Sequence, residues 1–253
     1  MTGSETLVGQ GPVKVIALHG WFGSARGWGM LPDLVDGDRF SYAFLDYRGY
    51  GSRQEVSGDH SLEEISADVR ETADRLGWDR YALVGHSMGG AAALRAYCDA
   101  PDRVTALVGI SPVPASGVPF DEETRALFEG AAEKPENRAA IIDFTTGNRH
   151  SPTWLRRMVD FSTCESTPGA VADYLRSWSG ASFHEDLPAP SVPVTAIAGP
   201  HDPALGPETM KVTWLEQLPG CRLEVLAEAG HYAMFETPVA LATLLEKSLP
   251  ESP

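Results

Sequence analysis

Cysteine is scarce in this sequence, and the few that occur form no metal-binding pattern. There are 3 cysteines among 253 residues, no CxxC pair occurs, and the histidines show no HxxxH spacing. Structural zinc sites are usually recognisable from spacings of this kind. We therefore expect no metal site.

Basic residues are also in short supply. Lysine and arginine number 20 against 35 aspartate and glutamate, which gives a formal net charge of −15. A field of this sign repels polyanions and anionic bilayers, so neither a nucleic acid nor a membrane surface is expected as a partner. From base rates alone we expect a monomer or a weak homodimer.

Long apolar runs are missing as well. No run approaches the roughly 18 residues that a membrane-spanning helix needs. Residues 1–12 (MTGSETLVGQGP) lack the basic and apolar pair of regions that is typical of a signal peptide. We expect a protein of the reducing cytoplasm.

Short apolar runs alternate with helical patterns along much of the chain. Residues 13–18 and 104–110 are nearly continuous in apolar side chains, which is typical of strands in a parallel sheet covered on both faces. Between Ser61 and Gly77, apolar residues recur every three or four positions, which predicts a helix with these two residues at its ends. The alternation predicts an α/β fold, with a mostly parallel central sheet flanked by helices.

The alternation stops between residues 112 and 193. Four helical patterns occur there, at residues 122–133, 136–144, 152–162 and 169–178, and no convincing strand. We interpret residues 112–193 as a helical cap inserted between two strands of one sheet. Residues 1–111 and 194–253 would then form the α/β core.

One segment has the sequence of an activated serine. Residues 85–89 (GHSMG) match G-x-S-x-G, follow an apolar run and precede an alanine-rich helical pattern. A tight turn from strand to helix strains the backbone of its central residue and presents that side chain at the carboxyl edge of the sheet. The N-terminus of the following helix supplies N–H groups near developing negative charge. Ser87 is therefore the predicted nucleophile.

Four motifs together resemble those of the α/β-hydrolase superfamily: residues 19–23 (HGWFG), 46–51 (DYRGYG), 85–90 (GHSMGG) and 230–231 (GH). The resemblance covers almost the whole chain outside the helical insertion and implies an α/β-hydrolase fold. Members include esterases, thioesterases, lactonases, carbon–carbon bond hydrolases, epoxide hydrolases and haloalkane dehalogenases. The last two attack with an aspartate at the position of Ser87, so these activities are disfavoured.

The partners of Ser87 follow from their places after strands. His231 comes shortly after the predicted strand at residues 222–226, and Asp202 after the one at residues 194–198. Carboxyl ends of parallel strands meet at one edge of a sheet, so both side chains should reach Ser87. The order Ser87, Asp202, His231 is the one expected of this fold. We predict His231 as the base and Asp202 as the residue that orients it.

An acyl-transfer site also needs two N–H donors where negative charge develops. Met88, directly after the nucleophile, should supply one from its backbone. The resemblance implies that the backbone of Trp21 supplies the other. No metal or organic cofactor is required.

The expected substrate is a small, soluble ester or thioester with an apolar acyl part, cleaved through an acyl-enzyme. The insertion should lie over Ser87 and help to form an apolar pocket. The candidate residues of this pocket are Phe22, Phe128, Phe144, Trp154, Met158 and Tyr232. Two alternatives stay open: a lactonase or carbon–carbon bond hydrolase with the same three residues, and a ligand-binding protein that kept the fold and lost turnover.

Overall fold

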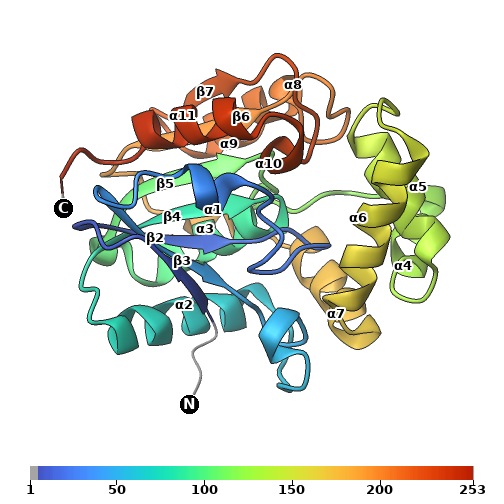
Figure 1. The fold of residues 1–253 in the computed structure, drawn as a ribbon, viewed down its shortest axis with the longest axis horizontal. Helices are drawn as coiled ribbons and strands as arrows, with labels where there is room; N and C mark the ends of the chain where they lie inside the picture. The colour runs from blue at the N-terminus through green and yellow to red at the C-terminus, as the bar shows by residue number, and fades with distance from the viewer. Residues whose placement is uncertain (1–4, 253) are drawn as a thin grey trace.

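A seven-stranded sheet runs through the part of the chain that the computed structural model describes, residues 5–252 (Figure 1). Its strand order is β1-β3-β2-β4-β5-β6-β7, and β1 is antiparallel to β3 while the other pairs are parallel. The strands are β1 (Glu5–Val8), β2 (Val13–Leu18), β3 (Phe40–Leu45), β4 (Tyr81–His86), β5 (Val104–Ile110), β6 (Val194–Ala198) and β7 (Arg222–Val225). The predicted mostly parallel α/β sheet is confirmed.

The five central strands are buried, as the continuous apolar runs at residues 13–18 and 104–110 predicted for two of them. Every residue of β3, β4 and β6 is buried, and β2 and β5 each have one half-buried residue. Strand β1 was not expected from the sequence. It is short and partly exposed and lies at the edge of the sheet, so its residues carry no strong apolar pattern.

Helices cover the sheet. In Figure 1, α2 (Leu62–Leu76) lies below the sheet and α11 (Pro238–Ser248) above it. Helix α3 (Met88–Asp99) packs between α2 and strands β2, β4 and β5, and α1 (Leu31–Leu34) packs on α11. Shorter elements are α8 (Pro207–Lys211), α9 (Trp214–Gln217), α10 (Ala233–Glu236) and the 3₁₀ turns η1 (Gly51–Arg53), η2 (Pro101–Arg103) and η3 (His184–Asp186).

Residues 207–217 form two short helices instead of one continuous helix. The chain breaks into α8 and α9 at Thr213, whose backbone leaves the helical region (φ −128°, ψ −89°). The break lets the indole of Trp214 reach the sheet, where it is fully buried and donates to the Val113 carbonyl over 3.3 Å. A Cβ on Gly109 would lie 2.8 Å from this indole, so the ring packs directly on β5.

Four helices connect β5 to β6: α4 (Glu122–Gly130), α5 (Pro135–Thr145), α6 (Pro152–Cys164) and α7 (Pro168–Ser179). They stand beside the sheet, at the right of Figure 1. Their starts follow from local sequence, because the side chains of Asp121, Ser151 and Thr167 accept hydrogen bonds from the first turns of α4, α6 and α7. None of the helices within residues 5–252 combines the length and apolar character required to cross a membrane.

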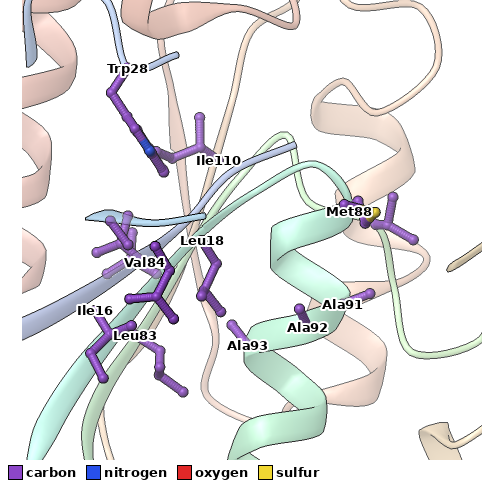
Figure 2. Close-up of a cluster of buried hydrophobic side chains, with 14 of the residues drawn as sticks. Ile16, Leu18, Trp28, Leu83, Val84, Met88, Ala91, Ala92, Ala93 and Ile110 are labelled. Atoms are coloured by element: carbon purple, nitrogen blue, oxygen red, sulfur yellow. The ribbon is translucent and has the colours of Figure 1, made fainter. Parts of the chain in front are cut away.

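The alanine-rich start of α3 allows this helix to lie very close to the sheet. Figure 2 shows Leu18 of β2 pointing toward α3 at the level of Ala93, and both side chains are fully buried. A Cβ on Gly89 would lie 2.1 Å from the Leu18 carbonyl oxygen and 2.8 Å from that of His19. Only glycine fits there, because the clashing atoms belong to the backbone of β2 and the residue after it.

We expect Gly89→Ala to lower the free energy of unfolding by about 1–3 kcal/mol, because α3 must move away from β2 to admit the methyl group. Urea denaturation measures the change. Gly169→Ala is the matched control: Gly169 lies in the first turn of α7, and a Cβ added there would meet no atom within 4 Å, so alanine should leave stability unchanged or raise it by up to about 1 kcal/mol. Equal effects of the two substitutions would contradict the packing argument.

Candidate active site

A cavity lies between the four helices α4–α7 and the loops that follow β2, β4, β6 and β7. Its empty volume is about 870 Å³, including space open to solvent. The lining residues are His19, Gly20, Trp21, Phe22, Gly23, Gly27, Trp28, His86, Ser87, Val113, Val118, Phe120, Phe128, Ile141, Thr145, Met158, Phe161, Trp178, Ala204, Leu205, His231, Tyr232, Met234 and Phe235. Apolar and aromatic side chains dominate, and none of the described Asp, Glu, Lys or Arg residues lines the cavity.

Ser87 stands at the turn from β4 to α3 in a strained backbone conformation, with φ 53° and ψ −118°. Such angles are rare for a residue other than glycine and persist only where the surroundings enforce them. Here the Ser87 N–H donates to the Ile110 carbonyl over 3.0 Å, and its carbonyl accepts from the Val113 N–H over 2.9 Å. The turn is tight, since a Cβ on Gly85 would lie 2.1 Å from the Gly89 carbonyl oxygen.

His231 and Asp202 meet after the last two strands. His231 Nδ1 lies 2.6 Å from Asp202 Oδ2, and both side chains are buried. The other carboxylate oxygen, Oδ1, accepts from the N–H groups of Ala204 and Leu205 over 3.0 and 3.1 Å. Because a carboxylate can only accept, Nδ1 carries the proton, and Nε2 of neutral His231 is left with a free lone pair. Ser87 and His231 line the same cavity.

His86 connects the turn at Ser87 to the loop that carries His231. Its Nε2–H donates to the His231 carbonyl over 2.9 Å, and the two imidazole rings are 4.9 Å apart. Burial, together with the nearby His231, holds the pKa of His86 well below its usual range. His86 is therefore a neutral donor that fixes the backbone of His231.

The loop after β2 is held by its own hydrogen bonds. The Gly20 carbonyl accepts from the Gly23 N–H over 2.9 Å and from His19 Nδ1–H over 2.8 Å. In a planar trans peptide the N–H points opposite to the C=O, so these two bonds fix the direction of the Trp21 N–H. A Cβ on Gly20 would lie 3.2 Å from Ser87 Cβ, which places this loop directly against the serine.

Two tyrosines of the DYRGYG motif hold the same loop from behind. Tyr47 Oη donates to the His19 carbonyl over 2.9 Å, and Tyr50 Oη donates to the Trp21 carbonyl over 2.8 Å. The Trp21 indole donates to the Val171 carbonyl of α7 over 2.8 Å. The sequence alone assigned no role to these two tyrosines, although both lie in the DYRGYG motif.

Two backbone donors near Ser87 have no partner in the part of the chain that the structure describes. Among residues 5–252, the N–H groups of Trp21 and Met88 donate no hydrogen bond to another protein group. The side chain of Met88 is fully buried and does not line the cavity, so only its backbone bears on the site. Two such groups beside one serine can receive a ligand oxygen.

Of the six residues expected to form a pocket, Phe22, Phe128, Met158 and Tyr232 line the cavity. The expectation for Phe144 and Trp154 is wrong. Phe144 is 51% exposed, because its side chain lies outside the buried face of α5. Trp154 lies one turn before Met158 on α6, beyond the cavity, where its ring packs on His150 and on the edge of Tyr232.

Several lining residues are outside the six expected ones. Ile141 and Thr145 are four apart on α5, and Phe161 is three residues after Met158 on α6, so helical spacing was an available signal. Leu205, Met234 and Phe235 come from segments after β6 and β7, where no periodicity marks them. Within residues 5–252, no group of three or more His, Cys, Asp or Glu side chains is placed to hold a metal ion.

Comparisons with known proteins agree with this fold. The family model described as alpha/beta hydrolase fold matches residues 14–238. The chain is 28% identical to the esterase YbfF of Escherichia coli (strain K12) over 93% of this chain and 92% of that protein. It is 25% identical to a 2-hydroxy-6-oxononadienedioate/2-hydroxy-6-oxononatrienedioate hydrolase of a Pseudomonas species, over 90% and 84% of the two chains. A solved esterase structure from Exiguobacterium antarcticum superposes with a TM-score of 0.85 at 20% identity, covering 96% of this chain and 93% of the other.

His19, in the loop after β2, makes the stability of the fold depend on pH. Burial lowers its pKa from 6.5 to about 4, against the opposing effect of the hydrogen bond to Gly20. Because the unfolded chain binds the proton more tightly, His19 costs no stability above its unfolded pKa. It destabilises the fold progressively as the pH falls from about 6.5 toward about 4.

We therefore expect the wild type to lose about 1–2 kcal/mol more unfolding free energy between about pH 7.5 and about pH 5.5 than His19→Asn loses. Asparagine can still donate to the Gly20 carbonyl but does not titrate. Urea denaturation at the two pH values measures the difference. Equal losses in both proteins would show that burial does not keep His19 neutral in the folded state.

Proposed function

The chain belongs to the α/β-hydrolase fold family and is a hydrolase, and from that premise we propose that it cleaves a small ester or thioester through Ser87, His231 and Asp202. The observation that carries the proposal is the buried 2.6 Å hydrogen bond between Asp202 and His231, which leaves Nε2 of His231 free in the cavity that contains Ser87. A serine hydroxyl attacks only when a neighbouring base takes its proton.

In the proposed mechanism, Ser87 Oγ attacks the acyl carbon while His231 Nε2 accepts its proton. Asp202 stabilises the imidazolium that forms and holds the correct tautomer. The N–H groups of Trp21 and Met88 receive the negative charge on the substrate oxygen, an assignment supported by their lack of partners within the described residues. His231 then protonates the leaving alcohol or thiol, and a water activated by the same nitrogen releases the acid from Ser87.

Helices α4–α7 would act as the cap over this reaction. Together with the segment that joins them to β5, they line the cavity with Val113, Val118, Phe120, Phe128, Ile141, Thr145, Met158, Phe161 and Trp178. All but Thr145 are apolar or aromatic. This lining supports an uncharged, apolar acyl group as the part of the substrate that the cap covers.

The same residues could open a lactone, whose acyl carbon is chemically equivalent. A carbon–carbon bond substrate of the dioate type, named for the Pseudomonas relative, carries two carboxylates. No Lys or Arg of the described chain lines this cavity, which favours a neutral ester over such a substrate. A binding protein without turnover would have no use for the oriented His231 or for the strained Ser87.

We expect Ser87→Ala and His231→Ala each to lower kcat on p-nitrophenyl esters by at least about 10⁴-fold, because either change removes the proton transfer that activates the nucleophile. A fluorophosphonate should label the wild type once, at Ser87, as measured by mass spectrometry of the intact and digested protein.

Full activity of Ser87→Ala, or labelling elsewhere, would refute the proposal. If the wild type is labelled at Ser87 but is inactive on esters of every acyl length, the result would contradict an ester substrate and favour a lactone or a carbon–carbon bond substrate.

The lining also predicts selectivity. An ester whose acyl chain ends in a carboxylate should have a kcat/KM at least about 100-fold below that of the neutral ester of equal length, because an unpaired charge buried in this cavity costs several kcal/mol. p-Nitrophenyl butyrate and mono-p-nitrophenyl succinate provide the comparison. Similar values for the two would contradict the assignment of a neutral acyl group.

A further inference from the structure

Glu236 binds the loop that carries His231 on both sides of the base. Its Oε2 accepts from the Gly230 N–H over 2.8 Å, and its Oε1 accepts from the Tyr232 N–H over 2.9 Å. The carboxylate is 2% exposed. One buried group therefore spans the residues directly before and after His231.

The loop has little room to shift. A Cβ on Gly230 would lie 3.1 and 3.2 Å from the two carboxylate oxygens of Glu236, and 2.9 Å from Thr146 Cα. The N–H of His231 itself donates to the Thr145 carbonyl at the end of α5 over 3.1 Å. Three consecutive backbone donors are thus held, while His86 holds the His231 carbonyl.

Glu236 is fixed in turn by the segment after α5. Arg149 Nη2 lies 2.5 Å and His150 Nε2 3.1 Å from its Oε2. Arg149 Nε also donates to the Thr146 carbonyl over 3.0 Å. All four groups around the carboxylate are donors, so the ionised form satisfies each of them. A neutral amide would turn an NH₂ group toward another donor.

We propose that Glu236 is a positioning residue for the base: it holds residues 230–232 so that Nε2 of His231 stays in line with Ser87 Oγ. Arg149 and His150 hold Glu236 in this role, which makes the segment after α5 part of the support of the catalytic base. The inference rests on the proposed function of Ser87 and His231. Glu236 does not line the cavity, so it acts on the chemical step and not on substrate binding.

The test is Glu236→Gln, which keeps the volume and removes one acceptor. Displacement of a catalytic group by about 1 Å can cost 10²-fold in rate. We expect kcat on a p-nitrophenyl ester to fall about 10- to 100-fold, with KM changed less than about 2-fold. The rate of Ser87 labelling by a fluorophosphonate should fall in parallel. Arg149→Ala, which leaves both loop hydrogen bonds of Glu236 in place, should lower kcat by a smaller factor.

Glu228→Gln is the matched control, because Glu228 precedes the same loop and is exposed, and only its backbone carbonyl takes part, as an acceptor from Arg149. It should keep wild-type kcat. Adding Glu236→Gln to His231→Ala should cause no further loss, since the group that Glu236 positions is gone.

A kcat of Glu236→Gln within about 2-fold of the control, or an equal further loss in the His231→Ala background, would overturn the inference and reduce Glu236 to a stabilising role. If Glu236→Gln does not fold, as judged by circular dichroism, Arg149→Ala decides the same question, and wild-type kcat in it overturns the inference. An active Ser87→Ala enzyme would instead refute the proposed function itself.

Discussion

The close approach of α3 to the sheet is the constraint on which the site depends. Gly89 allows the helix to start against the backbone of β2, and this brings the strained Ser87 beside the loop after that strand. The same approach aligns the helix N-terminus, the Met88 N–H and the loop at Gly20 around one serine. The energy stored in the Ser87 backbone is balanced by hydrogen bonds from β5 and from the segment after it.

The helical segment between β5 and β6 lines the cavity and also holds residues of the proposed active site in place. Trp21 is tied to α7 through its indole, and the N–H of His231 is tied to the end of α5. One of the two donors proposed for the substrate oxygen, the Trp21 N–H, and the base proposed for Ser87 are therefore both anchored to this segment. A change in its packing would alter the chemistry as well as the shape of the cavity.

Much of the site could be predicted from the sequence because strand order determines it. Ser87, Asp202 and His231 follow the parallel strands β4, β6 and β7, and parallel strands bring those positions to one edge of the sheet. The pocket was less predictable, because an apolar residue on a helix is equally suited to packing and to lining. Phe144 points to solvent while Ile141 lines the cavity, and only the rotation of α5 against its neighbours decides between them. Strand β1 escaped because an edge strand needs no apolar pattern.

Residues 111–193 separate two strands that pair directly, with Ile110 opposite Ile197. The pairing of β5 with β6 closes this long connection, and the entropic cost of loop closure grows only with the logarithm of length, by about 0.6 kcal/mol for each doubling. The free energy of pairing β5 with β6 therefore depends only weakly on the length of the connection. The base proposed at His231 depends on this segment through the end of α5 and through Arg149 and His150, and the Trp21 loop depends on it through α7. The parts of the segment between these anchors can therefore be lengthened, shortened or exchanged, and the substrate range can diverge while the reaction is retained.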